Sequence, residues 1–312
     1  MVFPDTVSIR FNSAVPSDIV RVMAKYKSTW DADGAFVRES GHDGNLYVSS
    51  TEAGGRVVGS LYNWAVINGV VSAESEFGRN ETACTLDALE GRYGLPSGTL
   101  YDGRVGRIDY AADLVLPRLP AVYVAAFGER PRTDLFRFGL TSVLYKTTKH
   151  EQEAYDTIAK RLAAKLPVPD RFAGKNVLRI EDRRRDTTKY FGCQVTGGML
   201  TDLAFRQELA RRWTCRALSI PVTREPLVVC PETKTRHRDA LAVRGLAAVG
   251  GREVEIARIR ASRRAGLITA DQAKVQISSV RDLASDPELT APTYIAAELK
   301  EAIHSAAQPI TL

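Results

Sequence analysis

Two short stretches of the same form constrain the fold of this chain more than any other feature. Residues 105–109 read VGRID and residues 177–181 read VLRIE, so a valine, an arginine and an acid recur at alternate positions. Successive side chains of a β-strand point to opposite faces of its sheet. The arginine and the acid of each stretch are therefore expected on one face of a strand. The two pairs are Arg107 with Asp109, and Arg179 with Glu181.

These two pairs allow two interpretations from the residues alone. Two carboxylates on neighbouring strands would be suitable oxygen ligands for Mg²⁺ or Mn²⁺, with the two arginines offsetting the repulsion between them. The alternative is a pair of cross-strand salt bridges, in which Arg107 contacts Glu181 and Arg179 contacts Asp109. The spacing by itself favours the salt bridges, and the metal site stays open.

The hydrophobic pattern of the remaining chain predicts an α+β fold. Its mostly antiparallel sheet would have helices packed on one face, followed by a smaller C-terminal helical region. Strands are expected at 5–11, 44–51, 55–67, 69–77, 104–116, 138–148 and 176–185, and helices at 16–30, 81–95, 120–128, 150–166 and 199–218.

The strand patterns stop after about residue 200, which suggests a second domain. We expect a first domain at 1–222 and a helical, possible DNA-binding region at 223–312, with helices at 238–251, 252–266 and 269–284.

The composition limits the class of protein. With 312 residues, 44% hydrophobic and 26% charged, the chain can bury a sizeable core and resembles soluble globular proteins. No apolar run approaches the roughly 18 residues of a membrane span, and the N-terminus lacks the pattern of a secretion signal. The four cysteines are scattered, which predicts reduced thiols, a cytoplasmic location and no zinc site.

Basic residues are concentrated in one segment. The chain has 43 lysines and arginines against 37 acidic residues, but between Arg171 and Arg216 eleven basic residues stand against five acidic ones. Such an excess fits a polyanionic partner, with phosphates as the obvious candidate, and it equally fits an ordinary solvated face.

Several common chemistries have no support in the sequence. The chain contains no G-x-x-x-x-G-K-[ST] loop, no dinucleotide-binding glycine pattern and no G-x-S-x-G motif. Its four histidines stand alone, without a second ligand at metal-binding spacing. Nucleotide-triphosphate, dinucleotide and serine-hydrolase functions are therefore not expected.

Three segments, in order and spacing, resemble a family of replication initiators. They read VGRIDYAADL at 105–114, TSVLYKTTKHEQEAYDTIAK at 141–160 and NVLRIEDRRRDTTKYFG at 176–192. The family is the gene II type of filamentous phages, together with related single-stranded DNA phage and plasmid replication proteins. The resemblance covers roughly residues 60–220 and includes SAESEFGRN at 72–80 and the segment 195–213.

The resemblance implies rolling-circle initiation. A tyrosine hydroxyl would attack one phosphodiester of single-stranded DNA at an origin, leaving a 5′-phosphotyrosine and a free 3′-OH that primes synthesis. The protein would be a site-specific DNA endonuclease and nucleotidyltransferase that uses Mg²⁺ or Mn²⁺. Its partners would be the origin DNA and a host helicase and polymerase in the bacterial cytoplasm, with no membrane.

Site residues follow from the same resemblance. Tyr155 matches the nucleophile, Asp109 and Glu181 match the metal ligands, and Glu74 is a weaker third ligand. The lysine usually found two residues after the tyrosine is absent, and Lys146, Lys149 or Lys160 could replace it. The remaining residues expected to contact DNA phosphates are Arg107, Arg179, Arg183, Arg184 and Arg185.

Tyr155 also has a structural interpretation. In the expected helix 150–166, Tyr155 shares a face with Ile158, Leu162 and Leu166, which is typical of a core stripe. Tyr145, beside Lys146, is the competing nucleophile. Two other functions stay open: a non-catalytic DNA-binding replication or regulatory protein, and a metal-dependent nuclease that hydrolyses DNA with water.

Overall fold

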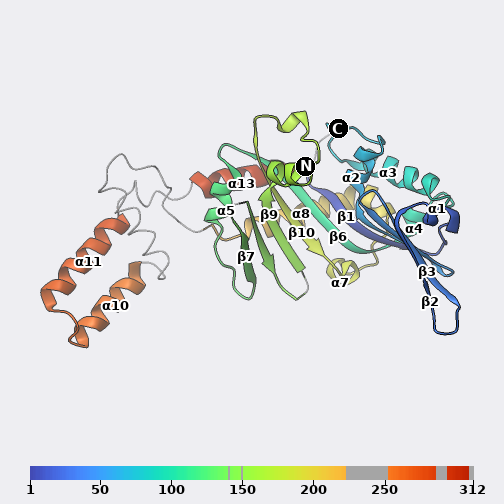
Figure 1. Ribbon diagram of the computed structural model, residues 1–312. Coiled ribbons are helices and arrows are strands. Elements are labelled where there is room, and N and C mark those ends of the chain that lie inside the picture. The colour runs from blue at the N-terminus through green and yellow to red at the C-terminus, as the bar shows by residue number, and fades with distance from the viewer. Residues whose placement is uncertain (140, 149, 223–251, 286–293, 309–312) are drawn as a thin grey trace. The chain divides into compact units, whose positions relative to one another are not determined.

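The computed structural model describes residues 1–139, 141–148, 150–222, 252–285 and 294–308 (Figure 1). In these ranges no helix has both the length and the apolar character needed to cross a membrane. Cys84, Cys193 and Cys215 are free and exposed, and Cys230 lies outside the described residues.

The fold is α+β, as the sequence predicts, and it is built on one ten-stranded antiparallel sheet. The strand order is β2-β3-β4-β5-β1-β6-β10-β9-β8-β7, so the first strand pairs with two later ones at the centre. The strands are β1 (Phe3–Phe11), β2 (Ala24–Trp30), β3 (Phe36–Asp43), β4 (Leu46–Thr51), β5 (Gly54–Ser60), β6 (Arg104–Leu116), β7 (Asp134–Phe138), β8 (Ser142–Lys146), β9 (His150–Asp156) and β10 (Asn176–Arg184).

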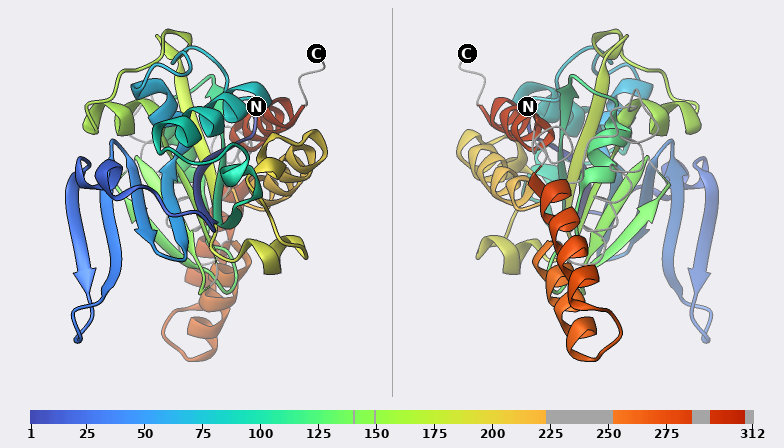
Figure 2. Two further views of the ribbon diagram at one scale, coloured as in Figure 1. Left: turned by 90° about the vertical axis from the view of Figure 1, so that its right-hand side faces the viewer. Right: turned by 90° about the vertical axis from the view of Figure 1, so that its left-hand side faces the viewer.

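The helices up to residue 218 connect these strands and pack against them, and a hairpin of β2 and β3 projects beyond them (Figure 2). The helices are α1 (Ser17–Arg21), α2 (Leu61–Ile67), α3 (Arg79–Arg92), α4 (Thr99–Asp102), α5 (Pro120–Ala126), α6 (Thr157–Ala163), α7 (Thr187–Phe191), α8 (Leu203–Leu218), α10 (Arg252–Arg264), α11 (Ala270–Ser285) and α13 (Tyr294–Ala307).

The two faces of the central strands differ in chemistry. Ile108 and Ile180 are fully buried on one face, where the indole Nε1 of Trp213 on α8 donates a 2.9 Å hydrogen bond to the Ile180 carbonyl oxygen. The opposite face carries Arg107, Asp109 and Asp113 of β6 with Arg179, Glu181 and Arg183 of β10, and α6 lies over part of it. The alternation in the sequence therefore places the isoleucines and the R-I-acid charges on opposite faces, and the isoleucine face also buries Asp182 and Arg184.

The contacts divide the chain into two compact units. The first contains Met1–Val124, Glu129–Ile220 and the C-terminal residues from Glu301, and the second contains Ala125–Gly128 and Pro221–Lys300. Within the second unit α10 and α11 pack together through Ile256, Ile259 and Ala273. The expected helix 238–251 lies outside the described residues.

The segment around Tyr155 differs from the helix expected at 150–166. Residues 150–156 form β9, which pairs with both β8 and β10, and the helix α6 begins only at Thr157. The Asp156 side chain caps α6 by accepting a 2.9 Å hydrogen bond from the Ala159 amide. The expected core stripe through Tyr155 is therefore wrong, because tertiary strand pairing outweighs the helical spacing.

Three N-terminal segments also differ from expectation. The helix expected at 16–30 ends at Arg21, and its second half is strand β2. The strand expected at 55–67 ends at Ser60, whose hydroxyl caps α2 by accepting a 3.2 Å hydrogen bond from the Asn63 amide. Residues 69–77 form no strand. The spacing of apolar residues does not fix where a helix or strand ends. Strand pairing of β2 and the Ser60 cap of α2 set these ends in the structure.

Candidate functional site

The two strands with the R-I-acid pattern are neighbours in the sheet. β6 and β10 pair antiparallel, with Asp109 opposite Arg183 and Ala111 opposite Glu181. Cross-strand partners project to the same face. The expectation that these two strands place their acids side by side on one face is therefore confirmed.

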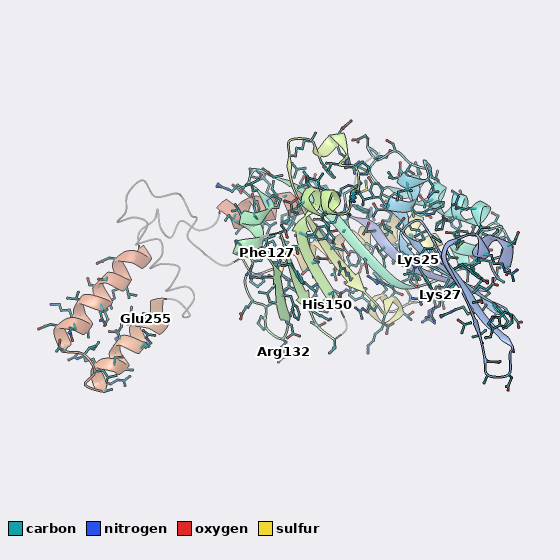
Figure 3. All side chains as sticks on the ribbon, in the orientation of Figure 1. Lys25, Lys27, Phe127, Arg132, His150 and Glu255 are labelled. Carbon is teal, nitrogen blue, oxygen red and sulfur yellow. The ribbon has the colours of Figure 1, made fainter. Side chains whose placement is uncertain are left out.

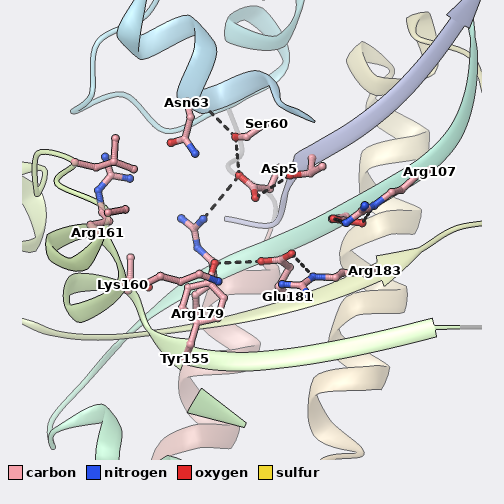
Figure 4. A pocket seen from close by; sticks show the side chains of 15 residues that line it. Asp5, Ser60, Asn63, Arg107, Tyr155, Lys160, Arg161, Arg179, Glu181 and Arg183 are labelled. Carbon is pink, nitrogen blue, oxygen red and sulfur yellow. Dashed lines mark hydrogen bonds and ion pairs between the residues drawn. The ribbon is translucent and has the colours of Figure 1, made fainter. Parts of the chain in front are cut away.

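A pocket of about 290 Å³ opens on this face (Figure 4). Its floor is formed by β6, β9 and β10, and residues from β1, α2 and α6 form its walls. Three acidic side chains and five basic side chains line it, so the lining carries a formal charge of +2 when all are ionised. The acids are Asp5, Asp109 and Glu181, and the bases are Arg107, Lys160, Arg161, Arg179 and Arg183.

Tyr155 lies in this pocket, opposite Arg179 on the neighbouring strand. Its hydroxyl donates a 3.1 Å hydrogen bond to Oε2 of Glu181, and Nζ of Lys160 lies 3.5 Å from the centre of its ring. The side chain is only 6% exposed. Burial raises the pKa of Tyr155 well above its usual value, so the phenol keeps its proton.

Glu181 is the acceptor for that proton. Burial acts to raise the pKa of Glu181, but the charge of Arg183 and its 2.7 Å hydrogen bond to Oε1 outweigh burial and lower the pKa. Glu181 therefore stays ionised at neutral pH while it accepts hydrogen bonds from Tyr155 and Arg183.

Asp109 is held by its own strand. Arg107 donates to both of its carboxylate oxygens, at 2.9 Å from Nε to Oδ1 and 2.5 Å from Nη2 to Oδ2. Asp109 is 1% exposed, and burial raises its pKa to about 6 despite the opposing effect of Arg107. Asp109 is therefore more easily protonated than Glu181, the other predicted metal ligand.

Arg179 differs from the expected salt bridge to Asp109. It forms a bidentate pair with Asp113, at 2.8 Å and 2.7 Å, and Nη1 lies 3.8 Å from Asp5. Arg107 likewise pairs within its strand and not with Glu181. The two cross-strand salt bridges expected from spacing are wrong, because the antiparallel register places Asp113 directly opposite Arg179.

Asp5 is a site residue that the sequence pattern did not indicate. It lies at the pocket wall on β1, is 7% exposed and accepts a 3.1 Å hydrogen bond from the Ser60 hydroxyl. Burial raises the pKa of Asp5, and Arg179 opposes this effect. An acid inside an otherwise apolar-alternating strand is the one local signal that could have identified it.

Five of the expected residues that the structure describes lie outside this pocket, namely Glu74, Lys146, Arg185, Tyr145 and Arg184. The carboxylate of Glu74 accepts hydrogen bonds from the backbone amides of Asp170 and Arg171, at 2.7 Å and 3.0 Å, so Glu74 is not a third ligand beside Asp109. Lys146 and Arg185 both contact Glu151 near the other end of β9. Lys149 lies outside the described residues.

Tyr145 and Arg184 belong to the opposite face of the sheet. Tyr145 pairs with Gln152, which in turn pairs with Asp182, and it is 0% exposed beneath Arg130. Burial raises the pKa of Tyr145 to about 12. Arg184 contacts Asp182 on the same face. The competing nucleophile therefore has no access to the pocket that holds Tyr155, Asp109 and Glu181.

The donor set does not fit a divalent metal in this arrangement. In the part of the chain that the structure describes, no three histidine, cysteine or acidic side chains are grouped to hold an ion. Both carboxylates at the centre already accept hydrogen bonds on each oxygen, from Arg107 in one case and from Arg183 and Tyr155 in the other. Mg²⁺ or Mn²⁺ stays a prediction of the sequence, and no step below depends on it.

Neither the models of protein families nor the curated proteins contain a match to this chain.

Proposed function

We propose that the protein nicks and rejoins single-stranded DNA at a replication origin by tyrosine transesterification. One observation carries the proposal: Tyr155 donates its hydroxyl proton toward an ionised Glu181 in a pocket lined by five basic side chains. A buried phenol is a poor nucleophile, and an adjacent carboxylate is the group that activates it.

The chain's own groups would act in a defined order. Lys160 would attract a phosphodiester to the mouth of the pocket, since its half-exposed side chain places Nζ 3.5 Å from the centre of the Tyr155 ring. The Tyr155 oxygen would then bond to phosphorus while the bond from phosphorus to the 3′-oxygen breaks. Glu181 would accept the phenol proton, and the leaving 3′-oxygen would take a proton from solvent. The product is a 5′-phosphotyrosine and a free 3′-OH.

Rejoining is the reverse of the same step. A 3′-OH attacks the phosphotyrosine and releases its proton to solvent, the bond from Tyr155 to phosphorus breaks, and the phenol oxygen regains a proton from Glu181. The exchange conserves the number of phosphoester bonds, so no nucleotide triphosphate is required. This agrees with a sequence that contains no phosphate-binding glycine loop.

A second candidate is a non-catalytic DNA-binding replication protein. The observation that favours it is the 6% exposure of Tyr155, which leaves little of the phenol open to a substrate. This candidate predicts origin binding without any covalent product.

The deciding experiment looks for a covalent adduct. The protein is incubated with labelled single-stranded DNA from the replicon's intergenic region, with Mg²⁺, with Mn²⁺ or with EDTA, and then denatured and separated by electrophoresis. A labelled band that maps to Tyr155 by peptide mass, and disappears in Tyr155→Phe, supports the proposal. Tyr145→Phe is the matched control, because it makes the same change on the opposite face.

The other outcomes separate the alternatives. Cleavage without an adduct identifies a hydrolytic nuclease, and binding without cleavage identifies a DNA-binding module. Loss of the adduct in EDTA would show that the reaction needs a divalent ion.

A further inference from the structure

We propose that an arginine tract on the open face of β3, β5, β1 and β6 binds the backbone of single-stranded DNA and guides it into the Tyr155 pocket. The arginine tract consists of Arg10, Arg38, Arg56 and Arg107. The inference rests on the proposed function, because it assigns a path for the same substrate to the same site. It concerns residues that the sequence pattern did not indicate, apart from Arg107.

Strand register places the tract on the pocket face. Ser8 lies opposite Arg107 on β6, and Thr6 lies opposite Asp109, so the even-numbered residues of β1 from Thr6 onward face the pocket side. Arg10 is therefore on that side as well, and Arg56 lies directly opposite it on β5. The Nε of Arg56 donates a 2.9 Å hydrogen bond to the Ser8 hydroxyl, which confirms this orientation.

Arg38 extends the tract toward the sheet edge. Arg38 lies two residues before Ser40 on β3, so the two side chains share a face. Ser40 lies opposite Ser49 on β4, and Ser49 lies opposite Arg56 on β5. The acid between Arg38 and Ser40, Glu39, points the other way and accepts hydrogen bonds from the Ser17 hydroxyl on α1. The arginine side chains therefore share a face from which this acid is removed.

Three of the four arginines in the tract have no carboxylate partner. In the described ranges no carboxylate forms an ion pair with Arg10, Arg38 or Arg56, whereas Arg107, Arg179 and Arg183 in the pocket each have at least one. The charges are also close together: burial and then the neighbouring Arg10, Arg107 and Arg38 lower the pKa of Arg56. A cluster of mutually repelling cations is stabilised when an anion binds across it.

The tract continues into the pocket through one residue. Arg107 lines the pocket beside Asp109, and it is also the neighbour of Ser8 in the middle of the tract. A phosphate chain lying along Arg38, Arg56 and Arg10 therefore reaches Arg107 without leaving the sheet face.

Aromatic side chains on the same face favour a single strand. His42 and Tyr47 are cross-strand partners on β3 and β4, and their rings meet edge to face with centres 5.5 Å apart. Both are partly exposed. Unpaired bases can stack on such rings while cations hold the phosphates, and bases inside a duplex cannot.

Lysine on the edge strand adds to the surface. Lys27 lies opposite Ser40, which places it on the tract face, and Figure 3 shows it with Lys25 on β2. The open face therefore combines cations with two partly exposed rings, the composition of a backbone-binding surface for single-stranded nucleic acid.

The test measures binding of a fluorescein-labelled DNA strand of about 20 nucleotides, by anisotropy, at salt concentrations between about 0.05 and 0.2 M. All proteins carry Tyr155→Phe, so that no covalent step contributes. The variant is Arg10→Gln, Arg38→Gln and Arg56→Gln together. The charge-matched control is Arg21→Gln, Arg132→Gln and Arg211→Gln.

The tract predicts a defined change in salt dependence. Each lost phosphate contact lowers the slope of log K against log salt by about 0.7, so three lost contacts lower it by about 2 and weaken binding roughly 100-fold at 0.1 M salt. The control triple variant should bind like its parent, and a duplex of the same sequence should bind more weakly than the single strand. Circular dichroism and thermal unfolding show whether the triple variant is folded. Arg38→Gln alone, at an exposed position, is a second variant that should weaken binding in the same direction but by less.

Three results would overturn the inference: unchanged binding by the tract variant, equal loss in the control variant, or tighter binding of the duplex. The inference and the proposed function can fail separately. An adduct at Tyr155 with unaffected binding by the tract variant keeps the nicking proposal and removes the tract. If the tract variant loses binding but the protein with Tyr155 intact never forms an adduct, the tract is supported and the nicking proposal is wrong.

Discussion

Tyr155 and Glu181 meet across two neighbouring strands, with the phenol oxygen 3.1 Å from the carboxylate. The contact is diagonal, because Tyr155 lies opposite Arg179 and Glu181 lies opposite Glu153 in the β9–β10 register. The sheet thereby holds a protonated phenol and an ionised acid together without any loop between them. Positions fixed by a sheet are well suited to proton transfer, which requires a constant short distance.

Replacement of Glu181 tests its role as proton acceptor. Glu181→Gln keeps the shape but removes the base, so the rate of adduct formation should fall about 10²- to 10⁴-fold, while oligonucleotide binding by anisotropy stays within about threefold. Glu153→Gln is the matched control: this residue pairs with Arg183 and Lys160 but makes no hydrogen bond to Tyr155. Equal losses in both variants would contradict a specific role for Glu181.

Lys160 is expected to act on Tyr155 through its charge. Its Nζ lies 3.5 Å from the ring centre, so Lys160→Met should lower the rate of adduct formation about tenfold, equivalent to roughly 1.4 kcal/mol of activation free energy. Lys160→Arg keeps the charge and should retain most of the rate. The measurement is single-turnover adduct formation with DNA in excess. An arginine variant as slow as the methionine variant would show that packing, and not charge, is what matters.

The buried pair of Arg179 and Asp113 should dominate the stability of the pocket floor. Arg179 is 7% exposed and pairs with Asp113. Asp113→Asn should lower the free energy of unfolding by about 3 kcal/mol, because the buried positive charge of Arg179 would then lie beside a neutral side chain. Urea denaturation of Asp113→Asn, Arg179→Met and the double variant forms a mutant cycle. The double variant should lose less than the sum of the two single variants, and strictly additive losses would contradict the pairing.

His150 should make stability depend on pH. Burial and then the positive charges of Arg216, Arg184 and Arg130 lower the pKa of His150 from 6.5 to about 4. Between these values the unfolded chain binds a proton that the folded protein does not, so stability contributed by neutral His150 is present above pH 6.5 and is lost as the pH falls toward 4.

The measurement compares urea denaturation of the wild type and of His150→Gln at pH 6.5 and 4.5. Between pH 6.5 and 4.5 the free energy of unfolding should fall by about 1–2 kcal/mol more in the wild type than in the variant. This figure is discounted for the partial exposure of His150. Both proteins contain the same carboxylates, so subtracting one change in the free energy of unfolding from the other cancels the contribution of those carboxylates. Parallel losses would show that His150 titrates normally in the folded protein.

The sequence pattern was sufficient where structure depends on neighbours along the chain. The strands at 104–116 and 176–185 and the helix near 199–218 were predicted closely, since alternation and helical spacing are local properties. The same local reasoning failed at 150–156, where apolar residues occur at helical spacing by coincidence. Pairing with β8 and β10 makes this segment a strand, and no local pattern contains that information.

The alternating arginines and acids of two stretches thus determined, by themselves, that one face of a sheet would be charged and that Arg107, Asp109, Arg179 and Glu181 would lie on it. Only the tertiary structure decided the partners. Antiparallel register sets Asp113 opposite Arg179, brings Asp5 from the N-terminus to the pocket, and leaves Glu74 and Tyr145 outside it. The physical reason is that a residue's own sequence governs the direction of its side chain, whereas its contacts depend on which strand pairs beside it and in which register.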